Sequence, residues 1–87
     1  MLKLSGVSNV FKRDIKRIKS QGKKFELLDE IIILLLEEKK LPAKYCNHKL
    51  IGNYQGYWEL HIKPDWLLIY KIIGDSLYLA RTGSHAE

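Results

Sequence analysis

Residues 57–70 decide the fold, and they read YWELHIKPDWLLIY. Over residues 57–63, apolar and polar side chains alternate with a period of two, as in a strand that buries one face. The Pro64-Asp65 pair that follows is typical of a tight turn. Residues 66–73 are almost continuously apolar, which indicates a central and well-buried strand. The stretch therefore predicts an antiparallel hairpin inside a sheet, with His61 on the face that points away from the core.

Two helices are predicted before this hairpin. Apolar side chains recur at intervals of three and four residues from Val7 onward, which predicts an amphipathic helix that Ser8 or Asn9 caps and Gly22 ends. A second helix is predicted over residues 23–39, where neither glycine nor proline occurs. Because proline cannot continue a helix, we expect Pro42 to stop it.

Short strands complete the predicted sheet. We expect an edge strand over residues 2–4, a strand entry over residues 49–51, and a closing strand over residues 77–81. The predicted order is β-α-α followed by an antiparallel β meander. This is an α+β fold of two layers, with both helices packed on one face of the sheet.

Length and composition restrict the class of protein. With 87 residues there is room for one domain, so we predict a single domain over residues 1–87. Cys46 is the one cysteine, which excludes an internal disulfide and fits a reducing compartment. The longest apolar run, residues 31–36, is far shorter than the roughly 18 residues that span a bilayer, and no signal peptide is visible. We therefore expect a cytoplasmic protein with no membrane partner.

Positive charge is concentrated in the first part of the chain. The net charge is +5, and residues 1–50 carry 12 Lys and Arg against 6 Asp and Glu, whereas residues 51–87 carry 3 against 4. Such a basic block raises the local concentration of a polyanion. The alternative is a helix face that is merely solvated. The block consists chiefly of Lys12, Arg13, Lys16, Arg17, Lys23 and Lys24.

Side chains suited to cleaving an RNA backbone lie near the predicted strand ends. Cleavage needs a base that deprotonates the 2′-hydroxyl, an acid that protonates the leaving 5′-oxygen, and a cation that stabilises the phosphate. Histidine suits both proton transfers, arginine matches two phosphate oxygens, and an aromatic ring can hold an unstacked base. The sequence offers His48, His61, His85, Asp65, Lys63, Arg81, Trp66 and Tyr57.

Each of these residues also has a structural explanation. Asp65 can cap a turn, Trp66 can pack in the core, and Arg81 can pair across strands with Glu59 or Asp65. Three histidines also suit zinc. Their spacings of 13 and 24 residues match no metal motif and no cysteine pair supports one, so we predict no metal site.

From His48 onward the chain resembles the YafQ branch of the RelE/ParE toxin superfamily, the toxin halves of type II toxin–antitoxin pairs. The resemblance extends over nearly the whole chain. It is densest at HKL (48–50), GY (56–57), ELHIKPDWLLIY (59–70) and LARTGSH (79–85). It implies a two-layer RelE-like fold and an endoribonuclease, an mRNA interferase, that cleaves mRNA in the ribosomal A site without a metal or other cofactor.

The resemblance also implies roles for single residues. His48 is expected to act as the base and His85 as the acid. His61, oriented by Asp65, and Arg81 are expected to stabilise the charged phosphate. The expected substrate contacts are Trp66, Lys63, Tyr57 and Lys49.

The implied partners are a cognate antitoxin that silences the toxin, mRNA, and the ribosome, with the basic block resting on ribosomal RNA. Operator DNA is expected only through the antitoxin. Three alternatives stay open: a ribonuclease that cuts free RNA without the ribosome, a non-enzymatic binding module like the ParE branch, and a scaffold that docks an antitoxin through the wide apolar surface of residues 31–36.

Overall fold

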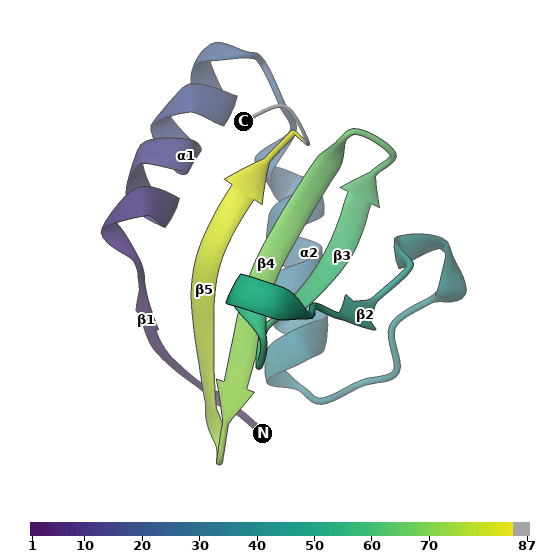
Figure 1. Ribbon diagram of the computed structural model, residues 1–87. Helices are drawn as coiled ribbons and strands as arrows, with labels where there is room; N and C mark the ends of the chain where they lie inside the picture. The colour runs from purple at the N-terminus through teal and green to yellow at the C-terminus, as the bar shows by residue number, and fades with distance from the viewer. Residues whose placement is uncertain (85–87) are drawn as a thin grey trace.

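Two helices pack against a five-stranded mixed sheet in the computed structural model, which describes residues 1–84 (Figure 1). The strand order is β1-β5-β4-β3-β2, with β1 parallel to β5 and all other neighbours antiparallel. This confirms the predicted α+β fold of β-α-α followed by an antiparallel meander. The elements in chain order are β1 (Lys3–Val7), α1 (Asn9–Ser20), α2 (Phe25–Leu36), the 3-10 turn η1 (Ala43–Tyr45), β2 (His48–Lys49), the 3-10 turn η2 (Gly52–Tyr54), β3 (Trp58–Lys63), β4 (Trp66–Ile73) and β5 (Ser76–Gly83).

Helix α1 begins where the sequence predicts, because Ser8 is its N-cap. The Ser8 hydroxyl accepts a hydrogen bond of 2.8 Å from the backbone N–H of Phe11. Ser8 also bonds to β5: its N–H donates to the carbonyl of Leu79 at 3.0 Å, and its hydroxyl donates to the carbonyl of Ala80 at 2.6 Å. The first turn of α1 is therefore attached to the middle of β5.

Helix α2 is shorter than the predicted 23–39, because it ends at Leu36, well before Pro42. Glu38 has a φ of 56°, in the left-handed region. This turn lets the N–H groups of Glu38 and Lys39 donate to the carbonyls of Leu35 and Leu34, both at 3.1 Å. A left-handed residue of this kind closes a helix without proline, so the prediction that Pro42 stops α2 was wrong.

The central hairpin agrees with the sequence pattern. Leu60 and Ile62 are buried in the core, whereas His61 lies on the opposite face. Figure 1 shows α2 behind β3 and β4 and α1 beside β5, which leaves the other side of the sheet uncovered by helices. We call that side the open face. Within residues 1–84, no helix is long and apolar enough to cross a membrane.

A β-bulge at Ala80 decides which way the end of β5 points. Leu79 pairs with Tyr70, but Arg81 pairs with Ile69, so Ala80 is left out of the pairing. Side chains alternate between faces along a strand, and one extra residue reverses the alternation beyond it. The bulge therefore places Arg81 on the open face. In a regular strand, the same arginine would point toward the helices.

Candidate active site

The structure groups His48 and His61 around Glu59 on the open face. Strand β2 pairs with β3 so that His48 lies directly opposite Glu59, and the two histidine rings have centroids 6.3 Å apart. The Nε2 atom of His48 is 3.4 Å from Oε1 of Glu59, and the Nε2 atom of His61 is 3.9 Å from the same oxygen. One carboxylate thus faces both imidazoles.

The hydrogen-bond partner of His48 fixes its tautomer. Nδ1 of His48 lies 2.7 Å from the carbonyl oxygen of Cys46. A carbonyl only accepts, so Nδ1 carries the hydrogen and donates it. In the neutral ring, Nε2 then holds the lone pair. This is the form that a general base acting through Nε2 requires.

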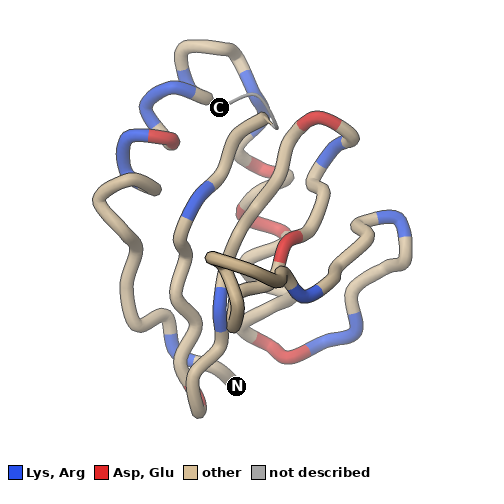
Figure 2. Tube along the Cα trace, viewed as in Figure 1, with Lys and Arg blue, Asp and Glu red and all other residues tan. Residues whose placement is uncertain are grey.

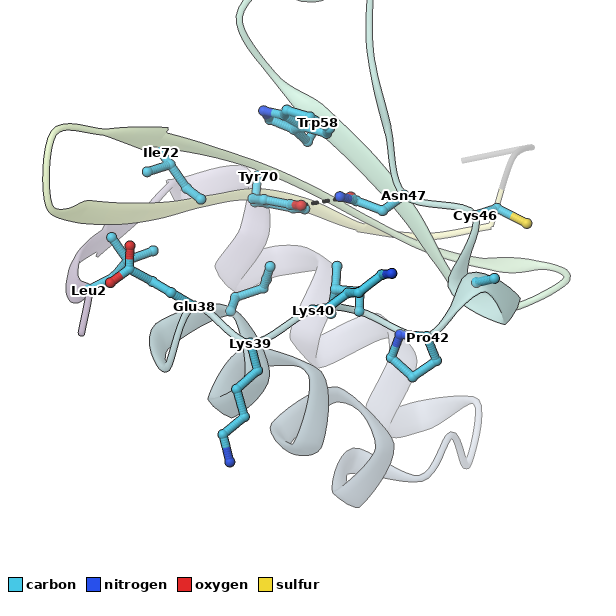
Figure 3. Close-up of a pocket in the computed structure, with 13 residues that line it drawn as sticks. Leu2, Glu38, Lys39, Lys40, Pro42, Cys46, Asn47, Trp58, Tyr70 and Ile72 are labelled. Carbon is cyan, nitrogen blue, oxygen red and sulfur yellow. Dashed lines mark hydrogen bonds between the residues drawn. The ribbon is translucent and has the colours of Figure 1, made fainter.

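The loop that carries His48 is held by the core. Tyr70 is 2 % exposed, and its hydroxyl donates a hydrogen bond of 2.6 Å to Oδ1 of Asn47, the residue before His48 (Figure 3). Burial raises the pKa of Tyr70 to about 12, so the phenol keeps the hydrogen that it donates.

Glu59 is a site residue that sequence reasoning missed. Its side chain is 15 % exposed. It lies two residues before His61 on a strand with a period of two, and this spacing places both side chains on one face. The alternation along β3 was the signal that could have found it.

Asp65 is not where the resemblance implied. It lies in the exposed turn between β3 and β4, where it lines a hollow of about 310 Å³ with Lys23, Lys24 and Trp66. The carboxylate that faces His61 in the described residues is that of Glu59. The structure therefore places Glu59, rather than Asp65, in the orienting position.

Arg81 lies across the open face from the histidines. Glu59 pairs with Ile69, and Ile69 pairs with Arg81, so the outer two residues are two strands apart. At roughly 4.8 Å per strand, their backbones are about 10 Å apart. Glu59, Ile69 and Arg81, together with Tyr54 and other residues, line a hollow of about 200 Å³.

The ion-pair partner of Arg81 in residues 1–84 is Asp14 of α1, and not Glu59 or Asp65 across the strands. Nε of Arg81 donates to Oδ2 of Asp14 at 3.0 Å, and Nη2 donates to Oδ1 at 3.2 Å. A contact between α1 and β5, which no sequence pattern indicated, thus holds the site arginine.

The buried position of Trp66 contradicts its predicted contact with a nucleotide. Its side chain is 2 % exposed and belongs to the core on the helix side of the sheet. Its Nε1 donates a hydrogen bond of 2.9 Å to the Thr82 hydroxyl, which in turn donates to the carbonyl of Leu67 at 2.8 Å. Trp66 therefore fixes Thr82, the residue next to Arg81, from inside the core.

The other predicted substrate contacts lie nearer the surface. Tyr57 is half-buried, and Nζ of Lys71 is 4.9 Å from its ring centroid. Lys63 is exposed and shares a hollow of about 590 Å³ with His61. Nζ of Lys49 lies 5.4 Å from the ring centroid of Trp58. His85, the predicted acid, lies outside the described residues.

The predicted basic block lies along α1 and the turn after it (Figure 2). Two of its members have partners within the protein. Nη1 of Arg17 is 3.2 Å from Oδ1 of Asp14, and Nζ of Lys23 is 5.7 Å from the ring centroid of Trp66. The exposed members are Lys12, Arg13, Lys16 and Lys24.

A larger hollow, of about 700 Å³, lies apart from this cluster (Figure 3). Leu2, Trp58, Tyr70 and Ile72 line it together with the segment after α2. None of the predicted catalytic residues lines it, so hollow size does not locate the chemistry. Within residues 1–84, no three His, Cys, Asp or Glu side chains are placed to share one metal ion.

An open sheet face with two histidines around a carboxylate and an arginine opposite them suits acid–base chemistry on a phosphodiester. The family model described as "Bacterial toxin of type II toxin-antitoxin system, YafQ" matches residues 5–87. The chain belongs to this family of bacterial toxins.

Individual relatives agree in sequence and fold. The mRNA interferase toxin YafQ of Escherichia coli K12 is 38% identical over 80 residues, which cover 91% of this chain and 87% of the relative. The YafQ-containing structure of the E. coli DinJ-YafQ complex matches with a TM-score of 0.87 and 35% identity, covering 97% of this chain and 96% of that one. A metal-bound toxin from Helicobacter pylori matches with a TM-score of 0.90 and 36% identity, covering 99% and 97%. These matches confirm the predicted family and fold.

Single-tryptophan variants test the buried position of Trp66. In the Trp58→Phe variant, we expect acrylamide to quench the remaining indole weakly and single-stranded RNA to leave its emission unchanged, because neither reaches the core. In the matched Trp66→Phe variant, the half-buried Trp58 should be quenched several times more strongly. Strong quenching of Trp66, or a change in its emission on adding RNA, would contradict the core position.

Proposed function

We propose that this chain is the toxin of a type II toxin–antitoxin pair and acts as an endoribonuclease on mRNA in the ribosomal A site. The observation that carries the proposal is the grouping of His48, Glu59, His61 and Arg81 on the open face. The relatives named mRNA interferase toxin support the activity. The proposed location is the cytoplasm, where ribosomes translate mRNA.

The proposed reaction begins at His48. Its Nε2 takes the proton of the 2′-hydroxyl, and the freed oxygen attacks the adjacent phosphorus. The 5′-oxygen leaves and takes a proton from the acid, for which His85 is the proposed donor. The products are a 2′,3′-cyclic phosphate and a 5′-hydroxyl end. The proton gained by His48 is stabilised by the Glu59 carboxylate, 3.4 Å away.

Negative charge builds on the phosphate oxygens during the attack. Arg81 and a protonated His61 supply positive charge from two sides of the open face, about 10 Å apart by the strand spacing. Lys63 and Tyr57 are the proposed contacts of the flanking nucleotides. Side chains supply both proton transfer and charge stabilisation, so the proposed chemistry needs no metal ion.

The proposed partners are the ribosome, its mRNA and a cognate antitoxin. The DinJ-YafQ complex shows that a relative binds a second protein. A net charge of +5 complements an acidic antitoxin segment and ribosomal RNA alike. We propose that the exposed lysines of α1 contact ribosomal RNA, and that operator DNA is reached only through the antitoxin.

Cleavage assays with His48→Ala and His61→Ala test the chemistry. Each variant should lower the rate on mRNA in translating ribosomes by about 10²- to 10⁴-fold, because it removes a proton-transfer or charge-stabilising group. The Ile73→Ala variant at the exposed end of β4 is the control and should keep the wild-type rate. Cleavage is measured by primer extension and by detecting the cyclic phosphate end.

Two results would contradict this reading. Full activity of the folded His48→Ala variant would remove the proposed base. Equal cleavage of naked mRNA without ribosomes would replace the ribosomal setting by a ribonuclease that acts on free RNA.

Charge reversal on α1 tests the ribosome contact. The Lys12→Glu/Lys16→Glu double variant should bind ribosomes at least about tenfold more weakly at moderate salt, because it removes phosphate contacts and adds repulsion. The Lys39→Glu/Lys40→Glu variant makes the same charge change after α2 and should bind as the wild type does. Sedimentation with ribosomes measures both. Equal binding by the two double variants would show that the α1 face is only solvated.

A further inference from the structure

Asp14 of α1 is a buried carboxylate bound to the end of β5, although 67 residues separate it from Arg81. Its side chain is 0% exposed. Its oxygens accept hydrogen bonds from Nε and Nη2 of Arg81 at 3.0 and 3.2 Å, from the N–H of Thr82 at 3.1 Å, and from Nη1 of Arg17 at 3.2 Å. Four donors from three residues converge on this one group.

Burial makes this arrangement specific. An ionised carboxylate away from water is stable only while charged or polar donors surround it. Nε and Nη2 lie on the same edge of a guanidinium, so a side-on pair fixes both the position and the plane of the group. The Arg81 side chain therefore loses its rotational freedom during folding, before any substrate arrives.

The contact also replaces a missing strand. The last pair between β1 and β5 is Val7 with Leu79, so the edge of β5 continues beyond the end of β1. There, Asp14 accepts the hydrogen bond of the Thr82 N–H that a neighbouring strand would otherwise accept. Ser8 binds the Ala80 carbonyl at the bulge from the same helix. Helix α1 thus holds β5 on both sides of Arg81.

We propose that Asp14 is a positioning residue for RNA cleavage, which holds the guanidinium of Arg81 in the orientation that receives the phosphate. This inference rests on the proposed function. A guanidinium has five N–H groups, so it can bind a carboxylate through one edge and a phosphate through another. Asp14 does not touch the substrate. It acts through Arg81, in the same way that a buried carboxylate orients a catalytic histidine in other enzymes.

A double-mutant cycle on the cleavage rate separates positioning from stability. The variants are Asp14→Asn, Arg81→Ala and their combination, assayed in single turnover on mRNA in translating ribosomes, with urea unfolding to confirm that each is folded. Asp29→Asn, the same substitution at an exposed position of α2, is the matched control. The rate at saturation and the concentration giving half of it are measured separately.

Asp14→Asn should lower the saturating rate on the order of 10- to 100-fold, with a smaller effect on the half-saturating concentration, because the guanidinium loses its fixed orientation. In the Arg81→Ala background, the same substitution should change the rate less than about twofold. Asp29→Asn should be active as the wild type is. An equal fall in both backgrounds, or no fall with Arg81 present, would overturn the proposal.

Two further measurements complete the test. In the unaltered protein, NMR should show the Nε–H of Arg81 exchanging with solvent at least about tenfold more slowly than that of exposed Arg13. Equal exchange would overturn the proposal even if Asp14→Asn fails to fold. Full cleavage by Arg81→Ala, or no cleavage by the wild type, would instead refute the proposed function, and the inference about Asp14 would fall with it.

Discussion

The buried carboxylate of Asp14 constrains the rest of this structure, because an ionised group without water must keep its donors in place. Its donors come from α1 itself and from the end of β5. Satisfying them requires α1 to lie beside β5 beyond the point where β1 ends. It also requires the bulge at Ala80, which turns Arg81 outward and leaves the Thr82 N–H at the edge of the strand. The open face owes its cation to this one contact.

The histidines have a separate support. Strand β2 is two residues long, so pairing with β3 alone would position His48 weakly. The hydrogen bond from the buried Tyr70 hydroxyl to Asn47 anchors the loop to the core, and the Cys46 carbonyl holds Nδ1. Groups held by rigid elements and by secondary contacts keep their geometry better than groups on free loops. The site thus combines two independently anchored halves on one sheet.

Sequence patterns predicted what depends on neighbours in the chain. The alternation over residues 57–63 predicted β3 and the direction of His61, and Ser8 predicted the start of α1. The bulge at Ala80 had no such signal, since strict alternation from Leu79 would turn Arg81 inward. Asp14 was hidden for a related reason, because its partner lies 67 residues away and only tertiary packing brings the two together. Glu59 was within reach of the pattern, and Trp66 was assigned by resemblance against a pattern that already favoured the core.

A structure of the protein on a ribosome whose A-site codon carries a 2′-O-methyl group, which blocks the attacking hydroxyl, tests this account most directly. The phosphate beside the methylated ribose should lie between Nε2 of His48 and the guanidinium of Arg81, within hydrogen-bond distance of the latter. Arg81 should still donate through Nε and Nη2 to Asp14, as it does in the free protein. A phosphate bound away from the open face, or an Arg81 released from Asp14 to reach it, would contradict the account.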